Sequence, residues 1–443
     1  MPNVTALLTR QGVRFLNSYA VNPACCPSRA TFVTGQYSHN NHVWDNKDGA
    51  RTGGFAALRN DRNTLPVALQ AAGYKTAMLG KYLNGYGHGS SKTYIPPGWD
   101  YWWALTNKPY FYYDYEVNDN GNVHTYGEGD ANYQTDVISG LIQQFIAANA
   151  SRPFFIWYTG VAPHEGYPGK NAPEPPTRYK GYFDNLALPH PPNFNEADMS
   201  DKPAFMQTIP LMDQSSINVA TNLYRRRAET LLAVDDMVLA IMKELASYGI
   251  RDNTYIIFTS DNGWFDGEHR KAASKFLLYE EALRVPLVIR GPGIPRGEVR
   301  TQMVSNLDVP ATIMDLLHAT PQRRGDGRSF VPVLTNPDLP WRTAMLIEGN
   351  DRAGEGDEDS HHAGYYAGVI TSMYKYAEHV DNNEVYTGNE FYDRSVDPYE
   401  LQSRPGDPSY AAVIADMQHK LSVLNTCAGT TCWWQDTAAA RHH

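Results

Sequence analysis

Apolar positions along the chain alternate between two spacings, and this alternation predicts helices and strands in turn. Side chains recur at helical spacing in three segments: residues 64–73, 133–148 and 218–247. Short apolar runs that read as strands follow them or lie between them: residues 74–79, 154–158, 254–259 and 285–290. Thr64 is the expected N-cap of the first helix and Gly73 its stop, and Gly249 ends the longest helix. Such alternation predicts an α/β fold with a mostly parallel central sheet flanked by helices.

The pattern changes near residues 331–345. Beyond this point lie short strand-like pieces and a last helix: residues 344–348, 366–370 and 410–424. We therefore expect a larger domain over residues 1–335 and a smaller α+β domain, with an antiparallel sheet and a terminal helix, over residues 336–443. Residues 162–216 are rich in Pro, Gly, Asn and Asp, which is typical of a loop that is functional or ordered by a ligand.

Composition narrows the class of protein. Of the 443 residues, 42% are apolar and 19% are charged, so the chain can bury a large core. The formal net charge of -10 disfavours a nucleic-acid binder, although a local basic pocket can still bind a polyanion. No apolar run reaches the ~18 residues that a membrane span needs. The aromatic clusters 101–103 and 111–113 fit either a surface for flat or sugar-like ligands or ordinary packing.

Four cysteines stand in two pairs. Cys427 and Cys432 enclose a short loop, so we expect a disulfide that indicates an oxidising compartment, with two free thiols as the alternative. Cys25 and Cys26 are adjacent, which makes a disulfide between them geometrically poor. Neither pair is followed by the second half of a zinc-site spacing.

Residues 25–35 read Cys-Cys-Pro-Ser-Arg-Ala-Thr-Phe-Val-Thr-Gly, which predicts a helix that Pro27 and Ser28 begin and Gly35 ends. A thiol at a helix N-terminus has a lowered pKa because the dipole and the free amides favour the anion. Arg29, one turn further, adds a guanidinium fork that suits a tetrahedral oxyanion. The segment therefore predicts an anion pocket with a reactive sulfur at its edge. A buried structural cysteine on a capped helix is the alternative.

The same segment resembles the signature of the sulfatase family, Cys-x-Pro-Ser-Arg followed by Thr-Gly. In that family a separate formylglycine-generating enzyme oxidises the first cysteine to Cα-formylglycine. The resemblance maps Cys25 to the modified nucleophile and Arg29 to the arginine that supports it, with Cys26 at the variable position. It covers nearly the whole chain and implies the alkaline-phosphatase-like α/β fold with a smaller C-terminal domain.

A second block, Gly-Tyr-Lys-Thr at residues 73–76 followed by Gly80-Lys81, resembles the second sulfatase signature. It maps Lys81 to a lysine that binds the sulfate and the formylglycine, whereas a lysine taken alone would be a solvated surface charge. The continuation Tyr-Leu-Asn at 82–84, with residues 94–99 further on, is similar to N-acetylglucosamine-6-sulfatases and heparan endosulfatases. The histidine that many arylsulfatases carry in this block is absent.

A third block, Thr-Ser-Asp-Asn-Gly at residues 259–263, directly follows a predicted strand. Its polar side chains are therefore expected at the carboxyl edge of the sheet, where α/β proteins bind ligands. Asp261 and Asn262 carry hard oxygens that suit Ca²⁺ or Mg²⁺, and the resemblance implies that they bind this metal together with residue 25. A strand-ending Asx turn is the alternative.

Three further residues map onto the sulfate site of the family. Lys275 falls where relatives have a lysine on the sulfate. His164 follows a predicted strand and maps to a sulfate-contacting histidine, a candidate proton donor to the leaving alcohol. His269 is a weaker candidate for binding substrate. Either histidine, considered without the family, reads as a loop or surface residue.

One part of the family pattern is missing. Sulfatases usually carry an Asp-Asp pair at the end of a first strand, upstream of the cysteine motif, and the segment before Cys25 contains no Asp or Glu. We expect the natural chain to begin further upstream, with a truncated, metal-poor relative as the alternative. Residues 1–5 show no export signal, and the resemblance implies a secreted, periplasmic or lysosome-like protein.

The resemblance implies a sulfuric ester hydrolase that acts through a formylglycine nucleophile with Ca²⁺ or Mg²⁺. Its expected substrates are aryl sulfates or sulfated sugars such as 6-O-sulfated N-acetylglucosamine. Two alternatives remain open at this stage: a phosphonate or phosphate monoester hydrolase of the same superfamily, and a non-catalytic sugar-binding homologue.

Overall fold

The computed structural model describes residues 1–47, 53–87, 92–106, 110–166, 172–351, 364–381 and 383–434. The helices are α1 (Pro2–Leu7), α2 (Cys25–Thr34), α3 (Ser38–Asn41), α4 (Gly54–Ala57), α5 (Leu65–Ala71), α6 (Gln134–Asn149), α7 (Ala204–Gln207), α8 (Gln214–Ser247), α9 (Glu280–Leu283), α10 (Asp308–Leu316), α11 (Val331–Thr335) and α12 (Ala411–Leu424). The strands are β1 (Val13–Phe15), β2 (Ser18–Tyr19), β3 (Lys75–Gly80), β4 (Tyr101–Leu105), β5 (Tyr115–Asp119), β6 (Asn122–Tyr126), β7 (Phe154–Thr159), β8 (Ile256–Thr259), β9 (Leu287–Arg290), β10 (Glu298–Arg300), β11 (Val304–Ser305), β12 (Ala344–Asp351), β13 (Gly364–Thr371), β14 (Tyr374–Val380) and β15 (Tyr386–Asp393).

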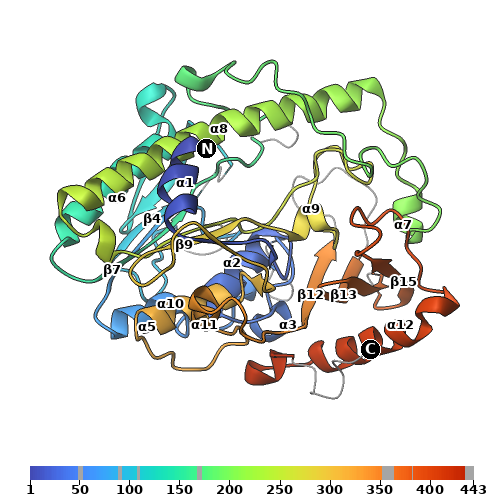
Figure 1. Ribbon diagram of the computed structural model, residues 1–443. Coiled ribbons are helices and arrows are strands. Elements are labelled where there is room, and N and C mark those ends of the chain that lie inside the picture. The colour runs from blue at the N-terminus through green and yellow to red at the C-terminus, as the bar shows by residue number, and fades with distance from the viewer. Residues whose placement is uncertain are drawn as a thin grey trace.

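Two sheets form the larger part of the molecule (Figure 1). One has the strand order β6-β5-β4-β3-β7 and the other β10-β1-β9-β8. Strands β4, β3 and β7 run parallel, as the alternation of helix and strand predicts, and β1 is parallel to β10. Antiparallel pairs are present beside these parallel ones: β9 runs antiparallel to both β8 and β1, and β5 runs antiparallel to both β4 and β6.

The predicted elements of this part are confirmed, with small shifts at their ends. Helix α8 begins at Gln214 rather than at the expected residue 218, because the side chain of Asp213 accepts a hydrogen bond from the Ser216 amide and caps it. Strand β9 begins at Leu287, since Pro286 has no N–H to donate to a neighbouring strand. Thr64 occupies the N-cap of α5, but its side chain makes no capping hydrogen bond.

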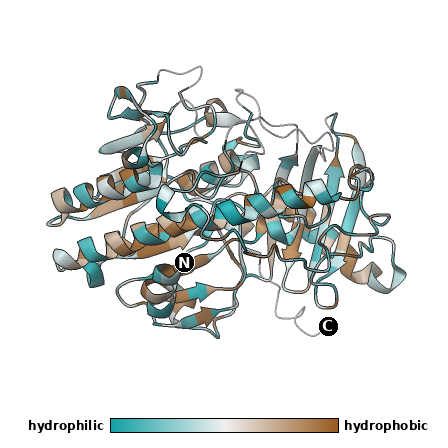
Figure 2. Cartoon of the chain, turned by 90° about the horizontal axis from the view of Figure 1, so that it is seen from above, coloured by the Kyte–Doolittle hydropathy of each residue, from teal (hydrophilic) through white to brown (hydrophobic). Residues whose placement is uncertain are grey.

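Helices cover both faces of the two sheets. Helices α1, α6 and α8 pack on one face, and α2, α5, α10 and α11 pack on the other. Figure 2 shows apolar and polar residues alternating along the long helices, as expected when one side of each is buried. Trp102 and Trp103 are fully buried in two different clusters, so this aromatic cluster serves packing.

Side chains of the edge strands β7 and β8 belong to the same two hydrophobic clusters. Ile156 and Ile256 share the hydrophobic cluster on one face, and Phe155 and Ile257 share the cluster on the other. Most residues of both strands are only partly buried, because within the described residues each strand has a hydrogen-bonded neighbour on one side only. The carboxyl ends of β3, β7 and β8 consequently open toward the same region.

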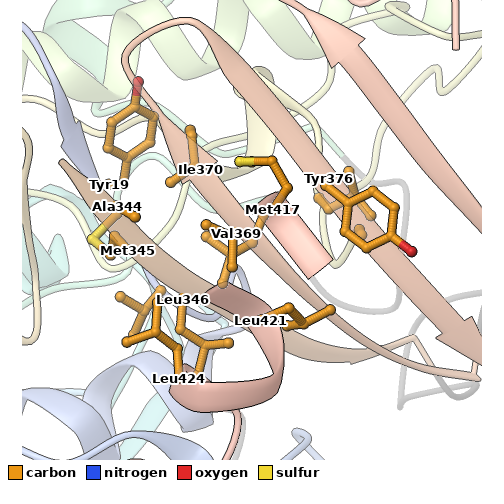
Figure 3. Close-up of a cluster of buried hydrophobic side chains, with 14 of the residues drawn as sticks. Tyr19, Ala344, Met345, Leu346, Val369, Ile370, Tyr376, Met417, Leu421 and Leu424 are labelled. Atoms are coloured by element: carbon orange, nitrogen blue, oxygen red, sulfur yellow. The ribbon is translucent and has the colours of Figure 1, made fainter. Parts of the chain in front are cut away.

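The smaller part is the antiparallel sheet β12-β13-β14-β15, covered by α12. Figure 3 shows the apolar side chains between this helix and the sheet, among them Leu346, Val369 and Leu421. Cys427 and Cys432 form the expected disulfide, with an S–S distance of 2.02 Å. Tyr19 belongs to the same core cluster, so the two parts are packed together, and the division near residue 335 stays a prediction.

The Pro-rich loop expected over residues 162–216 lies along α8, with residues 167–171 outside the described part. Phe183 donates its amide to Glu229 at 3.0 Å, and Arg225 donates to the Leu186 carbonyl at 2.8 Å. The loop is therefore fixed to the long helix by partly buried hydrogen bonds. None of the helices in the described ranges has both the length and the apolar character that a membrane crossing requires.

Asp308, at the start of α10, provides a test of the packing. Its carboxylate accepts hydrogen bonds from the amides of Ser305 and Arg328 and forms an ion pair with Arg342 at 2.5 Å, with both side chains at most 2% exposed. We expect Asp308→Ala to destabilise the fold by about 3–5 kcal/mol, because it leaves a guanidinium buried without its partner. Urea denaturation measures this loss, and the surface variant Asp252→Ala should leave the midpoint nearly unchanged.

Candidate active site

Helix α2 places Cys25 at its first residue. The helix begins at Cys25 rather than at the expected Pro27, because proline is tolerated within the first turn, where its missing N–H has no partner to lose. Gly35 ends the helix as expected, with φ of 67° in the left-handed region. The amide of Cys26 donates to the Asn46 side chain at 2.8 Å, which satisfies one free N–H of the first turn.

The sulfur of Cys25 is buried beside an ammonium group. Lys275 Nζ donates to Cys25 Sγ at 2.8 Å and lies 3.5 Å from His164 Nε2. Burial opposes ionisation of the thiol, but the charges of Lys275 and Lys81 lower the pKa of Cys25 well below its ordinary value. The neighbouring Cys26 lies within an apolar cluster, and burial raises the pKa of its thiol to about 12. The two adjacent cysteines therefore have opposite chemistry.

Lys81 is a second buried cation in the same region. It directly follows β3, and its side chain is 3% exposed. Its Nζ has no hydrogen-bond partner among the described residues and lies 4.2 Å from the ring centre of Tyr110. Burial lowers the pKa of Lys81. An ammonium group that is buried without a hydrogen-bond acceptor is a suitable binding point for an anion.

Arg29 connects the parts of the site to one another. Its Nε donates to Asp261 Oδ2 at 2.8 Å, and its Nη1 donates to the Lys81 carbonyl. Burial favours the neutral acid, but Arg29 and Lys275 lower the pKa of Asp261 to about 2. Arg29 thus supports the site by fixing Asp261 and the backbone of Lys81 rather than by touching Cys25 directly.

Asp261 and Asn262 lie just beyond the end of β8, as predicted. Ser28 Oγ donates to the Asp261 carbonyl at 2.5 Å, which ties this segment to α2. The side-chain oxygen of Asn262 is buried without a hydrogen-bond partner in the described part of the chain, while its Nδ2 donates to Gly263 at 2.7 Å. An orphaned amide oxygen beside an ionised carboxylate fits a hard cation such as Ca²⁺ or Mg²⁺.

The described residues contain no cluster of three or more His, Cys, Asp or Glu side chains that could hold a metal by themselves. Asp261 and Asn262 supply fewer than the roughly six to eight oxygens that Ca²⁺ takes. These two residues therefore fit part of a metal site, and residue 25 in a formylglycine form and a bound sulfate would add further oxygens.

His164 faces the same sulfur from the end of β7. Its Nδ1 donates to the Glu165 carbonyl at 2.9 Å, which leaves Nε2 directed toward Lys275. Burial and the charge of Lys275 lower the pKa of His164. Its ring stacks on Tyr110 at 4.6 Å and meets the ring of Trp264 edge-on at 6.2 Å.

His269 lies apart from this group. It is fully buried, its Nδ1 bonds Glu196 at 2.6 Å, and its Nε2 contacts the Asn193 side chain at 3.1 Å. Its ring also stacks on Tyr279 at 4.2 Å. Because both ring nitrogens are engaged in this network, the structure does not bring His269 together with Cys25, and its role in binding substrate stays a prediction.

Tyr110 and Trp264 lie near the site and were not expected from the sequence, and Asn84 ends the block 80–84 that the sequence singled out without a role for this residue. Asn84 donates to the Tyr110 hydroxyl at 2.9 Å. The buried indole N–H of Trp264 has no partner among the described residues, and its ring lies 5.7 Å from Lys275 Nζ. Trp264 follows the Asp-Asn-Gly block directly, so its position was a usable signal. Tyr110 directly precedes the aromatic cluster 111–113, for which the sequence left sugar binding and ordinary packing open.

Sequence comparisons agree with this geometry. A family model described as Sulfatase matches residues 1–319, and one described as N-sulphoglucosamine sulphohydrolase, C-terminal, matches residues 261–426. The chain is 34% identical to the N-acetylglucosamine-6-sulfatase of Capra hircus, over 96% of this chain and 80% of the relative. Its identity to the Homo sapiens protein of the same name is 33%, over 96% and 81%.

Solved structures share the fold. One, described as a complex with its substrate D-glucosamine-2-N,6-O-disulfate, has a TM-score of 0.78 and 25% identity, over 95% of this chain and 91% of that chain. A phosphonate monoester hydrolase of Agrobacterium radiobacter has a TM-score of 0.73 and 23% identity, over 96% and 90%. Because the family model matches most of its length and two relatives are 33% and 34% identical to it, the chain belongs to the sulfatase family of sulfuric ester hydrolases.

Proposed function

We propose that this sulfatase removes the 6-O-sulfate from an N-acetylglucosamine unit, with residue 25 as the nucleophile in its formylglycine form. The observation that carries the proposal is the 2.8 Å contact between Lys275 Nζ and Cys25 Sγ, close to the buried Lys81 ammonium that has no hydrogen-bond partner among the described residues. The names of the relatives and the glucosamine disulfate in the similar structure support this sugar class.

The chemistry of residue 25 depends on its modification. When present, the hydrated aldehyde supplies an oxygen nucleophile for the sulfur of the ester and a second hydroxyl that releases the sulfate. Lys81 and Lys275 are placed to neutralise the charge that develops on the sulfate oxygens. Arg29 keeps Asp261 ionised and holds the Lys81 backbone in position.

His164 is the candidate that gives a proton to the leaving alcohol. In the unliganded site its lowered pKa favours the neutral ring, because the side chain is buried and Lys275 lies close by. An anionic sulfate ester bound next to both residues would offset that charge and favour the protonated form. The Nδ1 contact with the Glu165 carbonyl keeps Nε2 directed into the site.

A divalent cation fits beside these residues. Asp261, Asn262 and the modified residue 25 would hold it, with additional oxygens from the substrate, and it would supply positive charge near the sulfate. Maturation requires the formylglycine-generating enzyme as a partner. The Cys427–Cys432 disulfide supports a location in an oxidising compartment, which agrees with a secreted or lysosome-like protein.

The first test compares the two adjacent cysteines. Cys25→Ala should lower the turnover of N-acetylglucosamine 6-sulfate by at least about 10³-fold, because it removes the nucleophile. Cys26→Ala should retain turnover within about tenfold, since that thiol only packs in the core. Peptide mass spectrometry should find formylglycine at position 25 in protein made with the maturation enzyme. Unmodified cysteine there would favour the non-catalytic homologue, and faster hydrolysis of a phosphonate ester would favour the phosphonate hydrolase.

The second test addresses the metal. Treatment with EDTA should abolish most turnover, and added Ca²⁺ or Mg²⁺ should restore it. Isothermal titration should show that Asn262→Ala weakens binding of the restoring ion at least about tenfold. Asp266→Asn, a change in the same loop at a carboxylate that pairs with Arg227, is the matched control. Equal affinities in the two variants would argue against a metal at Asn262.

The third test concerns proton donation. His164→Ala should reduce hydrolysis of the sugar ester at least about 10²-fold but hydrolysis of 4-nitrophenyl sulfate far less, because nitrophenolate leaves without a proton. Steady-state rates on both esters give the ratio. Equal losses on both would assign His164 to sulfate binding instead.

A further inference from the structure

The side chain of Tyr110 contacts three residues of the site. Tyr110 lies between β4 and β5, outside every motif of the family resemblance. Lys81 Nζ lies 4.2 Å from its ring centre, the ring of His164 stacks on it at 4.6 Å, and Asn84 donates to its hydroxyl at 2.9 Å. Lys81 and Asn84 come from the segment after β3, and His164 comes from the segment after β7.

Building on the proposed function, we propose that Tyr110 is a positioning residue that sets Lys81 and His164 on either end of the scissile S–O bond. Lys81 would contact the sulfate oxygens, and His164 would serve the leaving oxygen. One rigid ring that touches both fixes the separation between the sulfate-binding cation and the proton donor.

The surroundings of Lys81 support this role. Its ammonium is buried and has no hydrogen-bond partner in the described part of the chain, so the π face of Tyr110 adds to the charges of Cys25 and Asp261 in stabilising it before substrate binds. A four-carbon side chain without such a contact would sample several rotamers. The ring therefore holds the cation in place without neutralising it, which leaves the charge available to the sulfate.

The ring of Tyr110 is held by its stacking on His164, and its hydroxyl has one further contact, with Asn84. Asn84 is 8% exposed and its carbonyl accepts a hydrogen bond from the Phe55 amide at 2.7 Å, so the donor to the Tyr110 hydroxyl is anchored on both sides. Burial and the neighbouring Cys25 raise the pKa of Tyr110, which keeps the phenol neutral. A neutral ring in a fixed orientation suits a positioning role better than an acid–base role.

The ring and the hydroxyl can be separated by mutation. Tyr110→Leu removes the ring, whereas Tyr110→Phe keeps it and removes only the contact with Asn84. Tyr113→Leu is the matched control, because Tyr113 lies in the same segment and packs on Tyr133 at 5.3 Å. Each variant is assayed on N-acetylglucosamine 6-sulfate and on 4-nitrophenyl sulfate, after its thermal midpoint has been compared with that of the wild type.

We expect Tyr110→Leu to lower kcat on the sugar ester at least about 30-fold and on the aryl ester only about threefold, because misplacing His164 affects only the leaving group that needs a proton. Tyr110→Phe and Tyr113→Leu should keep the ratio of the two rates within about twofold of the wild type. A purely structural role would lower both rates equally, and that result would overturn the proposal. An equal effect of Tyr110→Phe and Tyr110→Leu on the ratio of the two rates would also overturn the proposal.

A binding measurement, which needs no turnover, tests the part of the proposal that concerns the placement of Lys81. In a Cys25→Ala background, adding Tyr110→Leu should weaken binding of inorganic sulfate about tenfold by isothermal titration, and unchanged affinity would count against the proposal. If Tyr110→Leu does not fold, Tyr110→Met is used instead, because it fills the same space without a π face and should shift the rate ratio in the same direction. Absence of wild-type turnover on both esters would overturn the proposed function, whereas an unaltered ratio with active wild type overturns only the role of Tyr110.

Discussion

The site depends on the burial of positive charge around one sulfur atom. Lys81, Lys275 and Arg29 are 3%, 5% and 9% exposed and meet near Cys25. Burying three cations is unfavourable unless negative or polarisable groups compensate. Asp261, the sulfur of Cys25 and the ring of Tyr110 do so in part, and the ammonium of Lys81 donates no hydrogen bond to the residues that the structure describes. The remaining positive charge is what makes the pocket complementary to a sulfate ester.

The residues of the site lie just beyond the ends of several strands and at the start of a helix. Lys81 follows β3, His164 follows β7 and Asp261 follows β8, so three segments distant in sequence reach one region. Helix α2 presents Cys25 to the same region from its N-terminus. Strand ends and a helix start are rigid positions, and the side chains they carry are therefore held in place without long flexible loops.

Local geometry gives the two neighbouring cysteines, Cys25 and Cys26, different pKa values. Cys25 and Cys26 are neighbours at the start of α2, yet the pKa of the first is lowered and that of the second is raised to about 12. Adjacent positions on a helix point about 100° apart, so one thiol meets Lys275 and the other meets an apolar cluster. The chemical difference arises from what each thiol faces rather than from the residue itself.

The motif residues Cys25, Arg29, Lys81 and Asp261 could be identified from sequence, because each belongs to a short block with a recognisable spacing at the end of a predicted element. The same holds for the order of the main helices and strands, which follows from local periodicity. The antiparallel course of β9, the isolation of His269 in its own network, and the contacts of Tyr110 were decided only by the tertiary structure. These features depend on contacts between side chains from segments that are far apart along the chain. The local sequence pattern contains no information about such contacts.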